Sequence, residues 1–148
     1  MEYEKEPYNS AGKKRVLLVD DEPDILKIVG KRLEMAGFDV LTAADGKSAL
    51  AKVRESLPDL IVLDVMLPGL NGYEVCSLLK QNKQTSHIPI IMLSAKGQEQ
   101  DYWKGMSSGA DAYLTKPFAG QELHNLIDRL IEAISNKPDK SDAKDENK

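Results

Sequence analysis

The sequence predicts an α/β fold in which a parallel sheet carries helices on both faces. Short runs of large aliphatic residues recur along the chain, and stretches with helical spacing of apolar residues separate them. A strand that is buried on both faces of a parallel sheet reads as a continuous Val, Ile and Leu run rather than as an alternation. Regular alternation of such strands with helices is typical of repeated βα units in one parallel sheet.

Five segments have the composition of these strands, at residues 16–19, 38–42, 60–63, 90–93 and 112–115. Pro68 follows the third segment and cannot donate a hydrogen bond to a sheet, so we expect this strand to end near Asp64. Pro117 is expected to end the fifth strand for the same reason.

Five helices are expected between and after the strands. The first has Pro23 in its opening turn and ends at Gly37. The second begins at Asp45 or Gly46, and Pro58 closes it. The other three are expected at residues 73–79, 98–108 and 123–134, and the last of them has a clear amphipathic pattern.

Length and composition indicate one folded domain. The chain has 148 residues, within the range of about 100–200 residues that is usual for a single domain. Both ends are polar, so we expect a flexible leader at residues 1–13, a folded domain at 14–136 and a disordered tail at 137–148. The sequence shows no membrane span and no signal peptide, which favours a cytoplasmic location.

The net charge, the single cysteine and the two histidines argue against several classes of function. The formal net charge is −4 and Lys and Arg do not cluster, which argues against direct contact with nucleic acid or a membrane surface. The single Cys76 is expected to be a small buried hydrophobe. His87 and His124 are isolated and expected at the surface, so the chain has no ligand set for zinc.

Polar residues follow four of the predicted strands. Asp20 and Asp21 follow the first, Asp64 the third, Ser94 the fourth and Lys116 the fifth. Because the carboxyl ends of parallel strands lie at one edge of the sheet, these side chains should share a pocket. Clustered carboxylates raise one another's pKa unless a cation neutralises them, and Mg²⁺ is the natural occupant of such an oxygen-rich site.

This set of side chains fits the transfer of a phosphoryl group to a carboxylate. An oxygen of Asp64 can attack phosphorus and form an acyl phosphate. Lys116 and Mg²⁺ would neutralise the phosphoryl oxygens, and Ser94 would donate a hydrogen bond to one of them.

Four segments carry a more specific pattern: VDDEP at 19–23, DVMLPGLNG at 64–72, LSA at 93–95 and GADAYLTKPF at 109–118. Together they resemble the receiver domain of the bacterial two-component response regulators, over residues 14–136. The resemblance, which is to chemotaxis-type receivers, implies a flavodoxin-like, doubly wound sheet of five parallel strands in the order 2-1-3-4-5 with five helices. It also implies a signalling switch that catalyses only its own phosphorylation and dephosphorylation.

The resemblance implies a role for each site residue. Asp64 would be the phosphoacceptor, with Ser94 and Lys116 on the phosphoryl group. Ser94 and Tyr113 would form the switch, in which Tyr113 turns inward as Ser94 moves toward the phosphoryl group. The Lys116–Pro117 peptide bond is expected to be cis.

The metal site also follows from the resemblance. Mg²⁺ would be ligated by Asp21, Asp64 and the backbone carbonyl of Met66, with Asp20 acting through water. Met66 and Lys96 occupy two variable positions that tune dephosphorylation in the family.

The implied partners are a histidine kinase or histidine phosphotransfer protein as donor, and a downstream protein effector. The effector would bind the face formed by the predicted elements at 98–108, 112–115 and 123–134, where Tyr102 and Trp103 place two aromatic residues. The chain would be a monomer or a phosphorylation-dependent dimer, either as a stand-alone receiver or as one excised from a longer regulator.

Two other classes use related parts. A magnesium-dependent phosphatase of the haloacid dehalogenase type needs a second Asp two residues after its nucleophile, where this chain has Met66. A flavodoxin needs a phosphate-binding loop after its first strand, where this chain has Asp20 and Asp21. Sustained turnover of a phosphate ester would favour the phosphatase, and single stoichiometric labelling favours the receiver.

Overall fold

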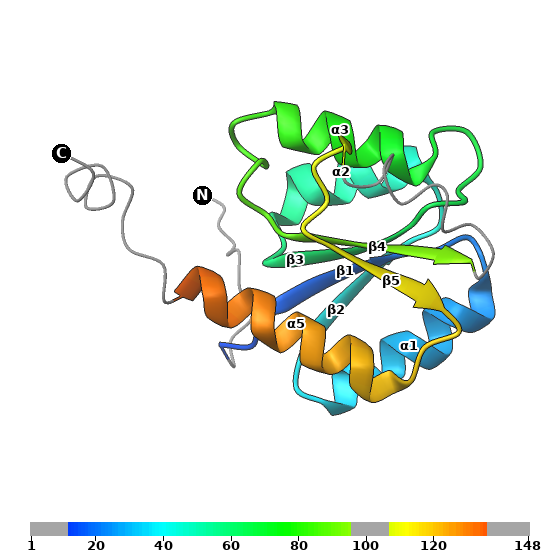
Figure 1. Cartoon of the computed structure of the whole chain (residues 1–148), viewed down its shortest axis with the longest axis vertical. Coiled ribbons are helices and arrows are strands. Elements are labelled where there is room, and N and C mark those ends of the chain that lie inside the picture. The colour runs from blue at the N-terminus through cyan, green and yellow to red at the C-terminus, as the bar shows by residue number, and fades with distance from the viewer. Residues whose placement is uncertain (1–11, 96–106, 136–148) are drawn as a thin grey trace, which may run out of the picture.

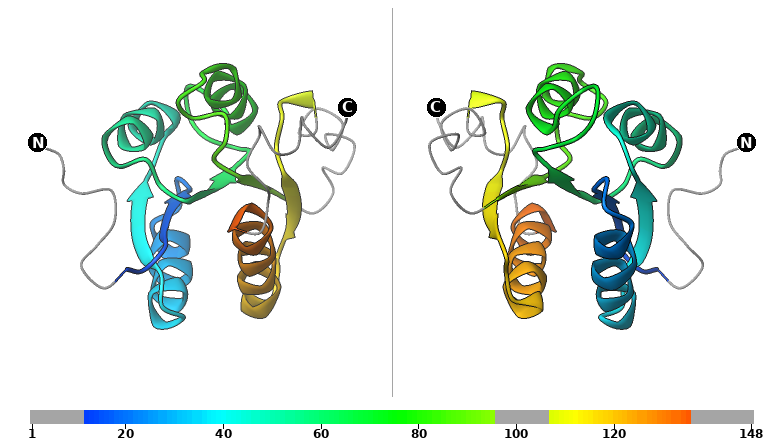
Figure 2. Two further views of the ribbon diagram at one scale, coloured as in Figure 1. Left: turned by 90° about the vertical axis from the view of Figure 1, so that its left-hand side faces the viewer. Right: turned by 90° about the vertical axis from the view of Figure 1, so that its right-hand side faces the viewer.

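The computed structural model describes residues 12–95 and 107–135, which form a parallel sheet between two layers of helices (Figure 1). The strands are β1 (Arg15–Val19), β2 (Asp39–Ala43), β3 (Leu60–Asp64), β4 (Ile90–Ala95) and β5 (Ala112–Lys116). The helices are α1 (Pro23–Met35), α2 (Gly46–Ser56), α3 (Gly72–Gln81) and α5 (Gly120–Ser135). Seen end-on, α2 and α3 cover one face of the sheet, and α1 and α5 cover the other (Figure 2).

The sheet has the strand order β2-β1-β3-β4-β5 with every pair parallel, as the sequence predicts. β4 and β5 both run further than expected, because the ladder between them continues through the pairs Ser94–Thr115 and Ala95–Lys116. Ser94 and Lys116 therefore lie within the last residues of their strands rather than beyond them.

Several predictions concern residues outside the described ranges. They are most of the helix expected at 98–108, the disordered tail, most of the leader, and the side chains of Lys96, Tyr102 and Trp103. Within the described ranges, no helix is both long enough and apolar enough to cross a membrane.

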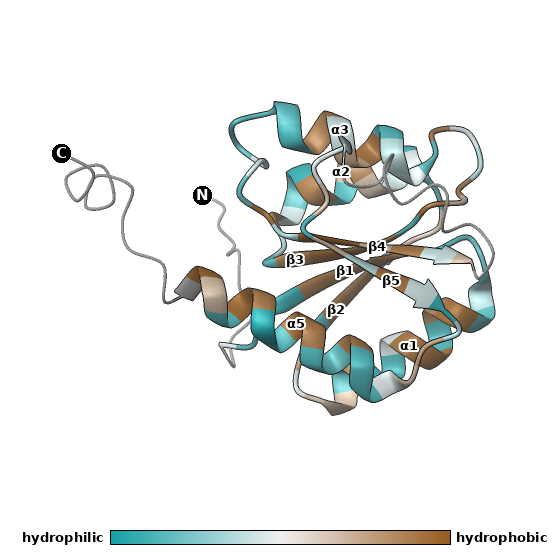
Figure 3. Cartoon of the chain, viewed as in Figure 1, coloured by the Kyte–Doolittle hydropathy of each residue, from teal (hydrophilic) through white to brown (hydrophobic). Residues whose placement is uncertain are grey.

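The core consists of two apolar clusters, one on each side of the sheet. The residues Leu60 to Leu63 of β3 are all fully buried, because alternate side chains enter opposite clusters. Hydropathy colouring shows β1, β3 and most of β4 as apolar, whereas β5 is paler and the helices around the sheet alternate between polar and apolar segments (Figure 3). Burial on both faces explains why the strands read as continuous aliphatic runs.

The predicted starts of α1 and α2 are confirmed. Pro23 lies in the first turn of α1, and the Asp45 side chain accepts a 2.7 Å hydrogen bond from the backbone N–H of Ser48 in α2. Asn71 and Glu74 form a reciprocal capping box at the start of α3.

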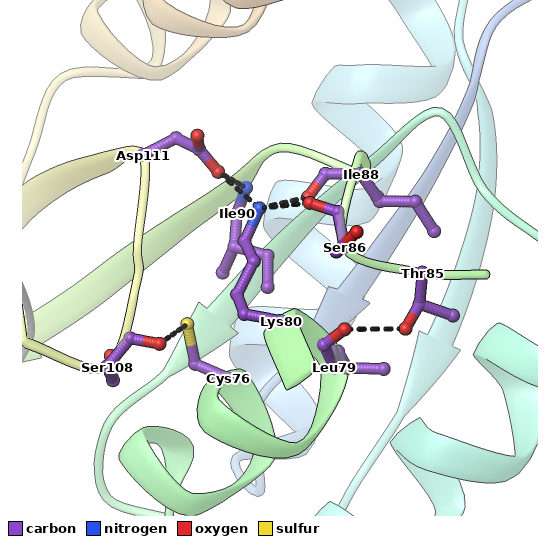
Figure 4. Close-up of polar contacts among 9 residues, drawn as sticks. All are labelled: Cys76, Leu79, Lys80, Thr85, Ser86, Ile88, Ile90, Ser108 and Asp111. Atoms are coloured by element: carbon purple, nitrogen blue, oxygen red, sulfur yellow. Dashed lines mark hydrogen bonds and ion pairs between the residues drawn. The ribbon is translucent and has the colours of Figure 1, made fainter. Parts of the chain in front are cut away.

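Lys80 connects three parts of the fold at the amino-terminal edge of the sheet (Figure 4). Its ammonium donates to the carbonyl oxygens of Ser86 and Ile88, at 3.1 and 2.8 Å, and to the Asp111 carboxylate at 2.9 Å. Asp111 also accepts a 2.8 Å hydrogen bond from the backbone N–H of Ile90. The end of α3, the loop before β4 and the turn before β5 are thereby joined by one side chain.

The cysteine and histidine predictions are confirmed except for His124. Cys76 is fully buried, burial raises the pKa of its thiol, and the thiol donates to the carbonyl oxygen of Ser108 at 3.5 Å. His87 is exposed. His124 is half-buried instead, because its ring packs edge-on against Phe38 with 5.8 Å between the centroids.

Candidate functional site

Three carboxylates meet at the carboxyl edge of the sheet. Asp20 and Asp21 directly follow β1 and Asp64 ends β3, and each offers an oxygen within 4.8 Å of the others. Asp20 is fully buried and Asp64 is 4% exposed, whereas Asp21 faces solvent. The convergence of these three residues was predicted from their positions after neighbouring strands.

Lys116 lies between the two buried carboxylates. Its ammonium is 3.1 Å from Oδ2 of Asp20 and 3.3 Å from Oδ1 of Asp64. The other oxygen of Asp20 accepts a 2.9 Å hydrogen bond from the backbone N–H of Glu22, which fixes the orientation of this carboxylate. The end of β5 is thus tied to the ends of β1 and β3.

The charges at this edge do not balance. Burial and the negative charge of Asp20 raise the pKa of Asp64 to about 6, although Lys116 and the backbone N–H of Met66 act against the shift. Burial alone would lower the pKa of Lys116, but the carboxylates of Asp64 and Asp20 outweigh it and raise this pKa. One ammonium cannot neutralise three carboxylates, so the donor set favours a divalent, oxygen-seeking cation.

Ser94 brings an unsatisfied hydroxyl to the same edge. Its side chain is fully buried, and Oγ has no hydrogen-bond partner in the described part of the chain. It directly follows Leu93, the residue that pairs with Asp64 across β3 and β4. Because buried hydroxyls are nearly always paired, this one is suited to a ligand atom that enters the site.

The turn after Asp64 depends on Gly72. A Cβ at this position would collide with the carbonyl oxygen of Asp64, and the Gly72 N–H donates to the carbonyl oxygen of Val65 at 2.9 Å. The chain therefore folds back directly onto the end of β3. The sequence places Gly72 in the motif at 64–72 but does not indicate this close approach, because a Gly and Asn composition indicates a turn without indicating what the turn touches.

Tyr113, the predicted switch residue, lies on β5 and is half-buried. Its hydroxyl is 3.1 Å from the hydroxyl of Tyr73 on α3. The sequence indicates only that Tyr73 begins the helix expected at 73–79, so this contact was missed. The Lys116–Pro117 peptide bond is cis, as expected.

An apolar groove runs along α1 and the start of α5. It has a volume of about 450 Å³, and its lining includes Ile25, Ile28, Phe118 and Lys116. Ile28 is 58% exposed. The groove opens beside Lys116, so it borders the acidic site.

Comparison with known proteins identifies the family. Residues 16–128 match the response regulator receiver domain, and the chain belongs to this family. It is 48% identical over 118 residues to the alkaline phosphatase synthesis transcriptional regulatory protein PhoP of Bacillus subtilis, covering 80% of this chain and 48% of PhoP. The chain therefore spans about half the length of this curated relative.

Solved structures show the same fold. The chemotaxis response regulator CheY4 of Vibrio cholerae is 35% identical with a TM-score of 0.75, over 80% of this chain and 98% of CheY4. The receiver domain of the sensor histidine kinase PA1611 from Pseudomonas aeruginosa is 30% identical with a TM-score of 0.76, over 81% and 98% of the two chains. Its structure has a magnesium ion coordinated in the active-site cleft.

These findings establish the class of function. The chain is a flavodoxin-like receiver domain, which is a phosphoacceptor signalling switch. The predicted absence of a nucleic-acid partner is not supported, because the relatives include a DNA-binding dual master transcriptional regulator, RpaA of Synechocystis.

Proposed function

We propose that Asp64 is the residue that accepts the phosphoryl group. The observation that carries this assignment is the pairing of a buried carboxylate with the ammonium of Lys116 at 3.3 Å, at the sheet edge that also holds the buried Ser94 hydroxyl, which has no partner among the described residues. Asp20 and Asp21 have no such combination: Lys116 and the Glu22 N–H occupy both oxygens of Asp20, and Asp21 faces solvent.

The reaction is an in-line displacement on phosphorus. An Oδ atom of Asp64 forms a bond to phosphorus as the phosphorus–nitrogen bond of a phosphohistidine donor breaks, and the electron pair of that bond stays on the imidazole nitrogen. Lys116 exchanges its contact with the carboxylate for one with a phosphoryl oxygen, and the Ser94 hydroxyl donates to another. The same residues serve dephosphorylation, in which water attacks phosphorus, the bond from phosphorus to the Asp64 oxygen breaks with its electron pair left on the carboxylate, and inorganic phosphate leaves. The chain would thus catalyse only its own phosphorylation and dephosphorylation.

Asp21, Asp64 and the backbone carbonyl of Met66 would hold Mg²⁺, with Asp20 acting through water. The all-oxygen donor set and its excess negative charge support this assignment, as does the magnesium in the cleft of the PA1611 receiver. When bound, Mg²⁺ supplies neutralisation of the charge on the phosphoryl oxygens.

The groove along α1 and α5 is suited to the phosphodonor. A donor histidine must reach Asp64, and the groove offers an apolar surface that is lined by both the exposed Ile28 and Lys116. A helical face of a histidine kinase or histidine phosphotransfer protein would bury this surface while presenting its phosphohistidine to the site.

The output is proposed to run through the face that contains β5 and α5, where Tyr113 lies, to a downstream protein effector. A monomer or phosphorylation-dependent dimer and a cytoplasmic location stay predictions.

Phosphorylation with acetyl phosphate, followed by intact-mass measurement, tests the assignment of Asp64. We expect one phosphoryl group on the wild type with Mg²⁺, and none on Asp64→Asn or after removal of Mg²⁺. Asp24→Asn is the matched control, because it makes the same change at an exposed residue in the first turn of α1. Labelling of Asp64→Asn would refute the assignment, and sustained turnover of p-nitrophenyl phosphate would support the phosphatase alternative instead.

A further inference from the structure

The turn between β3 and α3 lies directly against the first residue of α2. Gly46 begins α2 and is buried, and a Cβ at this position would lie 2.7 Å from the carbonyl oxygen of Leu70 and 2.8 Å from the Cβ of Leu70. These distances are shorter than van der Waals contact, and a backbone carbonyl cannot rotate aside as the end of a flexible side chain can. The turn can therefore occupy this place only while residue 46 has no side chain.

The same turn brings backbone groups to the phosphorylation site. The backbone N–H of Met66 donates a hydrogen bond to the Asp64 carboxylate, and the carbonyl of Met66 is the backbone ligand proposed above for Mg²⁺. At its other end the turn cannot yield toward β3, because the backbone of Gly72 already lies against the carbonyl oxygen of Asp64. A displacement of Leu70 must therefore be taken up within residues 65–71, the segment that carries Met66.

We propose that Gly46 is a positioning residue for the metal site: the absence of its side chain lets the turn lie where the Met66 backbone reaches both Asp64 and a bound Mg²⁺. The inference rests on the function proposed above. Gly46 belongs to α2 and acts on the site only through its contact with Leu70. A change at this position should therefore alter the geometry of the ligands and leave their charge as it is, because all three carboxylates remain.

Gly46→Ala tests the proposal with Mg²⁺ and Ca²⁺ as probes, since the added methyl group should displace Leu70 and with it the Met66 carbonyl. Mg²⁺ needs a nearly ideal octahedron of ligands at short distances, whereas Ca²⁺ accepts a more variable arrangement. The dissociation constant for Mg²⁺ should rise by about three- to tenfold, less than the roughly 10–100-fold cost of losing a direct partner of a ligand. The dissociation constant for Ca²⁺ should rise by less than about twofold. Titration calorimetry measures both.

Gly30→Ala is the matched control. Gly30 is a buried glycine of α1, on the other face of the sheet (Figure 2), and its Cβ would lie 3.9 Å from Cγ1 of Val40, an ordinary contact. Both dissociation constants should stay at their wild-type values in this variant. A Cβ at Gly46 would also lie 3.0 Å from Cγ2 of Val75, so Gly46→Ala should lose some stability to urea in EDTA. A merely structural role would produce that loss without changing the ratio of the two affinities.

An unchanged affinity for Mg²⁺ in Gly46→Ala, an equal loss for the two cations, or the same change in Gly30→Ala would each overturn the inference. If Gly46→Ala does not fold, Leu70→Ala decides by the same criterion, because it removes the side chain that rests on α2 and so loosens the turn. If the wild type binds Mg²⁺ and is labelled at Asp64, such results reject only the role of Gly46. If the wild type neither binds Mg²⁺ nor accepts a phosphoryl group, the proposed function fails together with the inference.

Discussion

At the scale of single residues, Asp64 is a charge that the fold destabilises. Its pKa is raised to about 6 by burial and by Asp20, so in the absence of metal the native state binds a proton more tightly than the unfolded chain does. The free energy of unfolding should therefore fall as the pH rises from about 4 to about 6. We expect Asp64→Asn to be more stable than the wild type at pH 7 by about 1–2 kcal/mol, a discounted value because Lys116 loses a partner.

Urea unfolding in EDTA at pH 4 and pH 7 measures this difference, which should shrink toward pH 4. Asp45 provides a control with the opposite sign, because the hydrogen bond from Ser48 lowers the pKa of this exposed cap. Its charge contributes stability above the unfolded pKa, and that stability is lost as the pH falls. The free energy of unfolding of Asp45→Asn should therefore be closest to that of the wild type in acid. If Asp64→Asn is less stable than the wild type at pH 7, burial does not destabilise the charge of Asp64.

At the scale of the elements, Lys80 fixes the amino-terminal edge of the sheet. Lys80→Met keeps most of the packing of the side chain beside Gly109 but leaves the carbonyls of Ser86 and Ile88 without their donor. Each unsatisfied polar group costs about 1–3 kcal/mol when it is buried, and these are partly exposed, so we expect a total loss of about 2–3 kcal/mol in denaturant unfolding. Lys83→Met, at an exposed position, should lose almost nothing; equal losses in both variants would refute the role of Lys80.

The elements themselves were predictable because their signals are local. Leu60 to Leu63 indicate a strand buried on both faces, and Pro23 and Asp45 mark the observed starts of α1 and α2. Lys80 gave no such signal, because its main partners are backbone carbonyls, which every residue has. The extension of β4 to Ala95 was missed for a related reason: pairing with β5, rather than side-chain composition, maintains the ladder there.

At the scale of the whole molecule, the site was predictable because topology creates it. Parallel strands bring Asp20, Asp64 and Lys116, which are far apart in the sequence, to one edge of the sheet. The residue type that follows each strand is read directly from the sequence. Contacts between side chains of different layers could not be predicted in this way. The hydroxyl pair of Tyr73 and Tyr113 depends on how α3 lies over the sheet, a geometry that no local pattern encodes.

The stability of the whole domain should depend on Mg²⁺, since a ligand that binds only the folded state stabilises it. At a Mg²⁺ concentration of about 100 times the dissociation constant, the gain is about 2.7 kcal/mol, which thermal unfolding detects as a higher melting temperature. The gain should be smaller at pH 5 than at pH 7.5, because protons compete with the metal for Asp64. Asp21→Asn should lose most of the effect while keeping the fold, since Asp21 is exposed. Equal stabilisation by NaCl at matched ionic strength would show that the cluster responds to screening rather than to a bound ion.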